Sequence, residues 1–168
     1  MAGDRKPILL RVVDRLRPWL GTERVFRAMS LYPPYLGAGV RVLPRDARAT
    51  TFDVELRMTS WNRNYFGTHF GGSLYAMCDP FFVLILAENL GPGYSVWDKS
   101  ASIRFRKAGR GTVRARFHIP PERIEQIRRE VDEQGKVEPV FTVEVKDGDG
   151  DVVCAVEKRL HVTKRKPV

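Results

Sequence analysis

Residues Asn64–Asn89 read NYFGTHFGGSLYAMCDPFFVLILAEN. A polar, glycine-bearing loop leads into a long apolar segment, and that segment carries a single acid, Asp79, about two helical turns in. Small residues leave backbone amides open to a ligand, and an apolar run of this length requires burial. The stretch therefore predicts a central buried helix with a glycine-rich entrance, and it holds most of the candidate functional residues.

On both sides of this stretch the apolar residues recur at every second position, which is typical of strands with one buried face. Before it, two such segments predict an antiparallel hairpin, and after it four more segments follow, the first two predicted to be neighbours joined by a turn at 108–111. A charged helix with a narrow apolar stripe, Ile124, Ile127 and Val131, interrupts them. The predicted strands are Val40–Pro44, Thr50–Met58, Ala101–Arg106, Val113–Ile119, Phe141–Val145 and Val152–Val162.

Two strands, an apolar helix and four further strands predict an α+β domain in which an antiparallel sheet curls around the helix. A helix this apolar should be buried nearly all round. We assign residues 39–168 to this domain and residues 1–38 to an N-terminal helical extension that packs on it. Between Ile8 and Leu20 the spacing predicts an amphipathic helix with a basic polar face, for which binding to a membrane surface is the alternative.

The chain has 168 residues and a formal net charge of +9, with 29 basic and 20 acidic side chains. The basic residues are dispersed and form no nucleic-acid-reading motif, so we expect no nucleic-acid partner. Cys78 and Cys154 are far apart and show no metal-ligand spacing, which favours a reducing compartment, no metal and a cytoplasmic location. The apolar run Pro80–Ala87 is too short to cross a bilayer, so we expect a soluble protein. The acidic run Asp147–Asp151 lacks the residues of a calcium loop and predicts a hairpin turn.

The spacing of Asn64, Gly67, Gly71, Gly72, Leu74 and Asp79 resembles the helix-entry motif of PaaI-type acyl-CoA thioesterases, which have the hotdog fold. The chain from Val40 to Val162 resembles the hotdog family DUF4442, notably in FGTHFGGSLYAMCDP and YSVWDKSASIRFRK. The resemblance implies a hotdog domain that hydrolyses a thioester. It also implies a dimer, or a dimer of dimers, with the site between subunits.

The resemblance implies four catalytic residues. Asp79 would orient and deprotonate water or attack the carbonyl itself, the alternative being a cap or ion pair near Pro80. Gly71 and Gly72 would offer amides to the developing oxyanion, the alternative being close packing of the helix. Asn64 would position water or substrate from the facing subunit, the alternative being an ordinary turn-forming residue.

The substrate-binding candidates are less uniform. PaaI-type enzymes carry a histidine immediately before the glycine pair, whereas this chain has Phe70 there and His69 one residue earlier. Both are candidates for substrate contact, and His69 could equally be a structural residue that bonds to backbone. The phosphates of coenzyme A would meet basic side chains on or beside one strand pair, although such residues also keep a sheet face soluble. These are Lys99, Arg104, Arg106 and Lys107.

We therefore predict an acyl-CoA thioesterase that needs no cofactor, coenzyme A being part of its substrate. The alternative is a non-catalytic hotdog module that binds acyl-CoA or a lipid-like ligand, which Phe70 makes credible.

Overall fold

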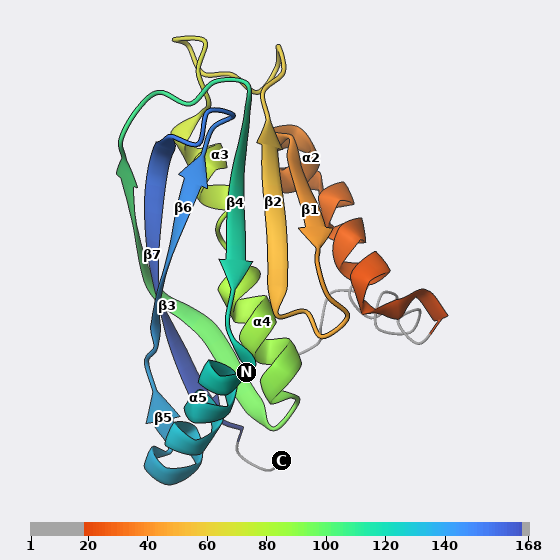
Figure 1. Cartoon of the computed structure of the whole chain (residues 1–168), viewed down its shortest axis with the longest axis vertical. Coiled ribbons are helices and arrows are strands. Elements are labelled where there is room, and N and C mark those ends of the chain that lie inside the picture. Colours follow the sequence, from red (N-terminus) through yellow and green to blue (C-terminus); the bar gives the residue numbers. More distant parts are fainter. Residues whose placement is uncertain (1–18, 166–168) are drawn as a thin grey trace, which may run out of the picture.

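The computed structural model describes residues 19–165. Its strands form one antiparallel sheet in the order β1-β2-β4-β6-β7-β3, with the short β5 beside β7 (Figure 1). This sheet curls around the helical segment that follows the glycine-rich loop, which confirms the predicted class. The strands are β1 Val40–Pro44, β2 Thr51–Arg57, β3 Tyr94–Phe105, β4 Thr112–His118, β5 Lys136–Val137, β6 Val140–Lys146 and β7 Val152–Lys164.

The helical elements lie on the concave side of the sheet and at its ends (Figure 1). The segment 19–28 is helical and leads through a short 3-10 turn into α2 beside β1, and α5 lies at the end of the sheet opposite the 58–70 loop. The remaining helical elements are η1 Met29–Leu31, α2 Pro33–Ala38, α3 Gly71–Ala76, α4 Phe81–Leu90 and α5 Pro121–Gln134. Phe26 and Tyr35 belong to the same hydrophobic core as the sheet. The predicted boundary at residue 38 stays a prediction, and the predicted helix before Trp19 lies outside the described residues.

The central helix is interrupted between α3 and α4. The amides of Cys78 and Asp79 donate to the carbonyls of Tyr75 and Ala76, three residues back, so the chain tightens after α3. Pro80 follows and has no N–H to continue the ladder. The interruption places Asp79 at a bend, where its side chain can leave the helix surface.

Helix α4 supplies the centre of the core. Phe81 lies 4.8 Å from the ring of Phe117, and Phe82 lies 5.0 Å from the ring of Phe141, both measured between centroids. However, Leu84 is half-buried and Ala87 is exposed, so the prediction of burial nearly all round was wrong for the single chain. The sheet covers one side of α4 and leaves the other partly open.

By length and composition, Gly71–Leu90 passes as a membrane-crossing helix among the described residues. Core helices of soluble proteins pass the same test, and the five most buried residues of α4 lie in the hydrophobic core of this domain. We therefore describe the segment as the core helix of the sheet.

The strand pairing confirms two predictions and corrects one. Strands β1 and β2 form the predicted hairpin, and the turn after β6 is closed by Asp147, whose carboxylate accepts the amides of Asp149 and Asp151. The prediction that the strands around residues 101–106 and 113–119 are neighbours was wrong. Strand β3 pairs with β7 at one edge, whereas β4 lies between β2 and β6. Alternation identifies a strand and its buried face but not its partner.

Candidate functional site

The glycine pair begins α3. The amides of Gly71 and Gly72 lie in the first helical turn, where backbone N–H groups have no acceptor within the helix. A Cβ on Gly71 would lie 3.0 Å from the ring of Phe105, and a Cβ on Gly72 would lie 2.5 Å from the ring of Phe70. Small residues are thus required by the packing of two phenylalanines, and they also leave the amides accessible.

Asn64 closes the loop that leads to the glycine pair. Its side-chain oxygen accepts the amides of Phe66 and Thr68, at 2.9 and 3.1 Å. Its side-chain nitrogen donates to the Thr68 hydroxyl and to the carbonyl of His69. The turn-forming interpretation of Asn64 is therefore seen directly, and its role in catalysis stays a prediction.

His69 joins this loop to the turn before β4. Its Nε2 lies 3.0 Å from the carbonyl oxygen of Gly111 and must donate there, so Nδ1 is the unprotonated nitrogen. The side chain is buried, and no described residue bonds to Nδ1. Burial lowers the pKa of His69, and the bond to Gly111 opposes this only in part. His69 thus acts as a structural clamp between the loop and the turn before β4, as the backbone-bonding alternative predicted.

Two surface pockets flank the glycine pair. One, of about 490 Å³, includes Gly72, Phe70, Asn64 and Trp61 in its lining. The other, of about 370 Å³, is lined by Gly71, His69 and the segment 105–109, among others. His69 and Phe70 therefore border cavities beside the helix entrance, and their contact with substrate stays a prediction. Neither cavity includes Asp79 in its lining.

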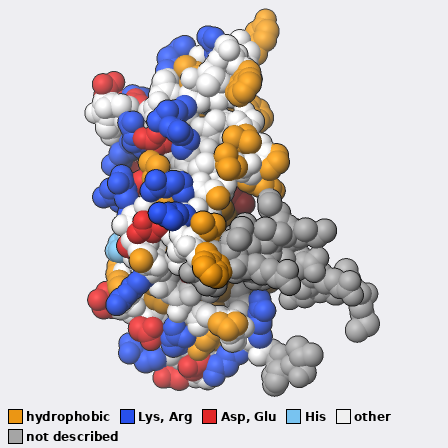
Figure 2. Space-filling model, turned by 90° about the vertical axis from the view of Figure 1, so that its right-hand side faces the viewer, with side chains coloured by type: hydrophobic (Ala, Val, Ile, Leu, Met, Phe, Trp, Pro, Cys, Tyr) orange, Lys and Arg blue, Asp and Glu red, His pale blue; other side chains and the backbone are white. Residues whose placement is uncertain are grey.

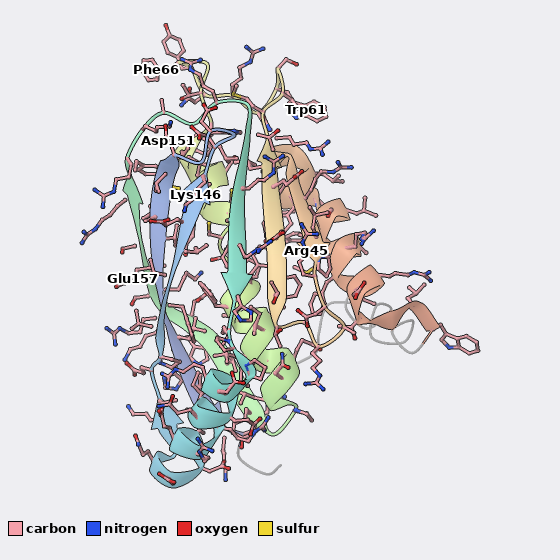
Figure 3. All side chains as sticks on the ribbon, viewed as in Figure 1. Arg45, Trp61, Phe66, Lys146, Asp151 and Glu157 are labelled. Carbon is pink, nitrogen blue, oxygen red and sulfur yellow. The ribbon has the colours of Figure 1, made fainter. Side chains whose placement is uncertain are left out.

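The 58–70 loop also exposes large aromatic side chains. Figure 3 shows Trp61 and Phe66 at the tips of the loops, pointing away from the sheet, and they are 78% and 80% exposed. Figure 2 shows hydrophobic side chains gathered along one margin of the molecule, whereas Lys and Arg are interspersed with acidic residues over the neighbouring surface. The tips of the loop therefore present exposed aromatic side chains, whereas the neighbouring surface is charged.

Asp79 occupies the bend between α3 and α4. Its carboxylate oxygen Oδ1 lies 3.0 Å from Nζ of Lys158, and its carbonyl oxygen lies 2.7 Å from the same nitrogen. The side chain is 52% exposed. The ion pair near Pro80 that the sequence left open as the alternative is therefore present, because a distant strand supplies the counter-ion at the bend. The catalytic role of Asp79 stays a prediction.

Lys158 was not predicted from the sequence. It lies on β7, is fully buried, and reaches Oδ2 of Asp98 on β3 at 2.8 Å as well as Asp79. Its Nζ also lies 5.3 Å from the ring centroid of Tyr75 on α3 and 3.5 Å from the Tyr75 hydroxyl. The available signal was a lysine at an apolar position of a strand, between Val156 and Leu160.

Burial and the neighbouring charges shift the pKa values of Lys158 and Asp98 in opposite directions. Burial lowers the pKa of Lys158, but the hydrogen bonds and charges of Asp98 and Asp79 outweigh it, and the net pKa is raised. Burial raises the pKa of Asp98 more than Lys158 lowers it, and the Asp79 charge adds to the rise. The lysine ammonium is therefore held firmly charged between two carboxylates.

The predicted phosphate-binding residues are not gathered in one place. Lys99 lies at an irregularity of β3 and pairs with Glu138 at 2.5 Å. Arg104, farther along β3, is exposed and lies about 16 Å from Lys99 at the usual rise of a strand. Arg106 and Lys107 follow β3 and line the smaller pocket. The structure thus brings Arg106 and Lys107 together at this pocket, and neither Arg104 nor Lys99 is in its lining.

Lys107 is also engaged by the turn after β6. Its ammonium lies 2.6 Å from a carboxylate oxygen of Asp147 and 2.6 Å from one of Asp151, which Figure 3 places at the same end of the molecule as Phe66. The hydrogen bonds to Asp147 and then Asp151 raise the pKa of Lys107. A phosphate would have to compete with these two acids, so Arg104 and Arg106 are the freer candidates.

A strongly curled antiparallel sheet around a central helix, with a glycine pair at the helix entrance and a carboxylate at its bend, defines a hotdog-fold protein. The family model described as "Domain of unknown function (DUF4442)" matches residues 21–162. The chain belongs to this family.

Solved structures share the fold. A Pseudomonas aeruginosa protein of unknown function, described as a probable thioesterase, has a TM-score of 0.75 at 19% identity over 84% of this chain and 95% of its own. Thioesterase HI1161 from Haemophilus influenzae has a TM-score of 0.61 at 12% identity, over 85% and 91%. The Escherichia coli PaaI protein of the phenylacetic acid degradation operon has 0.58 at 16% identity, over 89% and 98%. No match was found among curated proteins.

Proposed function

We propose that the protein is an acyl-CoA thioesterase in which Asp79 is the catalytic carboxylate. The observation that carries the proposal is the position of Asp79, which lies at the helix bend, half-exposed, with one oxygen held by a buried lysine. A carboxylate fixed in this way can accept a proton from water while that water attacks a carbonyl, or can attack the carbonyl itself. Similarity of fold to proteins described as thioesterases supports the same class of reaction.

In the hydrolytic form of the reaction, the water oxygen bonds to the thioester carbonyl carbon as Asp79 takes its proton. The carbonyl oxygen becomes an oxyanion, which the amides of Gly71 and Gly72 can stabilise by hydrogen bonds. Collapse of the intermediate breaks the C–S bond, and the proton returns to the leaving thiolate. The products are a carboxylic acid and coenzyme A, and no cofactor is consumed.

In our proposal, the glycine pair and the Asp79 carboxylate that act on one substrate molecule belong to different subunits. Gly72 and Asp79 are seven residues apart, which corresponds to roughly 10 Å along a helix. Two groups that hydrogen-bond to one reacting centre lie within about 6 Å of each other. The β3 edge and the partly open side of α4 are the surfaces through which a second copy can bring its glycine pair to Asp79.

For the ligand, we propose that Arg104 and Arg106 contact coenzyme A phosphates, because guanidinium groups bind phosphate oxygens in pairs. The nearby pocket of about 370 Å³ has both Arg106 and Gly71 in its lining and can hold part of the substrate. We also propose a cytoplasmic location, no nucleic-acid partner, and a dimer or dimer of dimers.

The test is hydrolysis of phenylacetyl-CoA, hexanoyl-CoA and palmitoyl-CoA, followed by chromatography of released coenzyme A. We expect turnover by the wild type and a loss of roughly 10²–10⁴-fold in kcat for Asp79→Asn, the usual range for removing a general base. Asp149→Asn, in the exposed turn after β6, is the matched control and should retain wild-type activity.

Two results would overturn the proposal. Full activity of Asp79→Asn would remove Asp79 from the mechanism. Calorimetric binding of all three esters without turnover above buffer would replace the enzyme by a binding module, the alternative that Phe70 at the helix entrance favours.

A further inference from the structure

The buried lysine on β7 is unusual in its burial and its partners. Lys158 has no exposed surface, yet groups of three residues from separate segments meet its ammonium. These are the carboxylate and carbonyl of Asp79 at the helix bend, Asp98 on β3, and the hydroxyl and ring of Tyr75 on α3. Lysine is almost never fully buried unless it is paired.

The arrangement is poorly explained as a stabilising ion pair. Burying a lysine and most of an aspartate costs solvation free energy that their attraction often does not recover, and well-packed apolar residues often serve equally well. One oxygen of Asp98 is also buried and has no hydrogen-bond partner among residues 19–165. A cluster retained despite these penalties suggests a role other than stability.

The contacts fix Asp79 more than a single ion pair would. Nζ of Lys158 bonds both to the Asp79 backbone carbonyl and to its side-chain oxygen, so main chain and carboxylate are tied to one point. The stem of Lys158 is set by its place in β7, between two neighbouring strands. Asp98 binds the same ammonium from the opposite strand and keeps it from turning away.

We propose that Lys158 is a positioning residue for the reaction, which holds the Asp79 carboxylate aimed at the substrate, with Asp98 anchoring the lysine. The inference rests on the proposed function of Asp79. Lys158 itself transfers no proton and forms no bond to the substrate.

The test compares Lys158→Met with the double variant Lys158→Met/Asp98→Asn. Methionine keeps the length of the stem and removes the charge. The single variant leaves the Asp98 carboxylate without its counter-ion. The double variant also removes the charge of Asp98, so no unpaired carboxylate remains at that position. Lys164→Met, an exposed lysine on the same strand, is the control and should behave as wild type. Urea unfolding establishes that each variant is folded.

With phenylacetyl-CoA, hexanoyl-CoA and palmitoyl-CoA, positioning predicts that kcat falls roughly 10²-fold while KM changes little, as when a catalytic group is misplaced by about 1 Å. Recovery of activity in the double variant would overturn the inference, since Lys158 would then only neutralise Asp98. A rise in KM as large as the fall in kcat would overturn it as well, since substrate binding rather than the position of Asp79 would then have been lost.

A measurement without turnover separates this inference from the proposed function. If the wild type hydrolyses none of the three esters, the proposed function fails. The Hα–Hβ couplings of Asp79 then decide the clamp alone, because they report whether its side chain occupies one rotamer. Couplings that average over rotamers in Lys158→Met but not in the wild type support the clamp, and couplings identical to the wild type overturn it.

Discussion

Gly39→Ala should destabilise the protein far more than a similar change elsewhere. Gly39 lies between α2 and β1 with φ of +82°, and a Cβ there would lie 2.6 Å from both the carbonyl oxygen of Arg57 and Nδ2 of Asn62. Neither neighbour can yield easily, because Arg57 is in β2 and the Asn62 amide donates to two carbonyls at 2.7 Å each. The left-handed conformation costs an alanine about 1 kcal/mol. Displacing Asn62 sacrifices two bonds of about 1 kcal/mol each, so we expect a loss of about 3 kcal/mol in the free energy of unfolding.

Gly150→Ala provides the matched control. Gly150 has φ of +89° and nothing within 4 Å of its would-be Cβ, so only the backbone term applies, about 1 kcal/mol. Urea unfolding followed by circular dichroism measures both variants. At a typical slope near 2 kcal/mol/M, the midpoint should fall by about 1.5 M for Gly39→Ala and about 0.5 M for Gly150→Ala. Equal losses in the two variants would refute the steric argument.

Three further predictions concern buried side chains. Burial lowers the pKa of His69, so on acidification the unfolded chain binds a proton at this residue at a higher pH than the folded chain does. The free energy of unfolding should therefore decline as the pH falls below 6.5, the ordinary pKa of histidine. His69→Gln should remove this decline in urea unfolding between pH 5 and about 7, and an unchanged slope would contradict it. Burial raises the pKa of Cys78, and that of Cys154 to about 11, so iodoacetamide at pH 8 should modify neither until urea unfolds the protein. Phe81→Ala should lose about 4 kcal/mol, read as a fall in Tm of roughly 8–16 °C, with a drop below 3 °C as the contrary result.

The sequence was most informative where a local pattern of residue types is enough to identify an element and its buried face. Alternation located the hairpin of β1 and β2, and the apolar stripe of α5 is buried as predicted. Pro80 indicated a bend, although not how far it would expose Asp79. The glycine pair was placed correctly at the start of α3.

What depends on pairing between distant segments could not be read from the pattern. The partner of β3 is β7 rather than the strand after it, because a turn signal does not specify which edge of the sheet the next strand joins. For the same reason Lys158 and Asp98 escaped the site prediction. Lys158 differs from its apolar neighbours on the strand, but neither residue indicates its partner, and only the pairing of β3 with β7 brings both to Asp79.

The place of β7 in the sheet also orders events during synthesis. It is the last strand of the domain to leave the ribosome, and its partners in β3 were made long before it, as the pair Tyr94 and Lys164 illustrates. Until β7 emerges, the hydrophobic core lacks the buried residues that this strand contributes, such as Val156, Leu160 and Val162, and Asp79 and Asp98 lack their shared cation. The hydrophobic core and the ionic cluster are therefore completed together, by the same strand, at the end of translation of the domain.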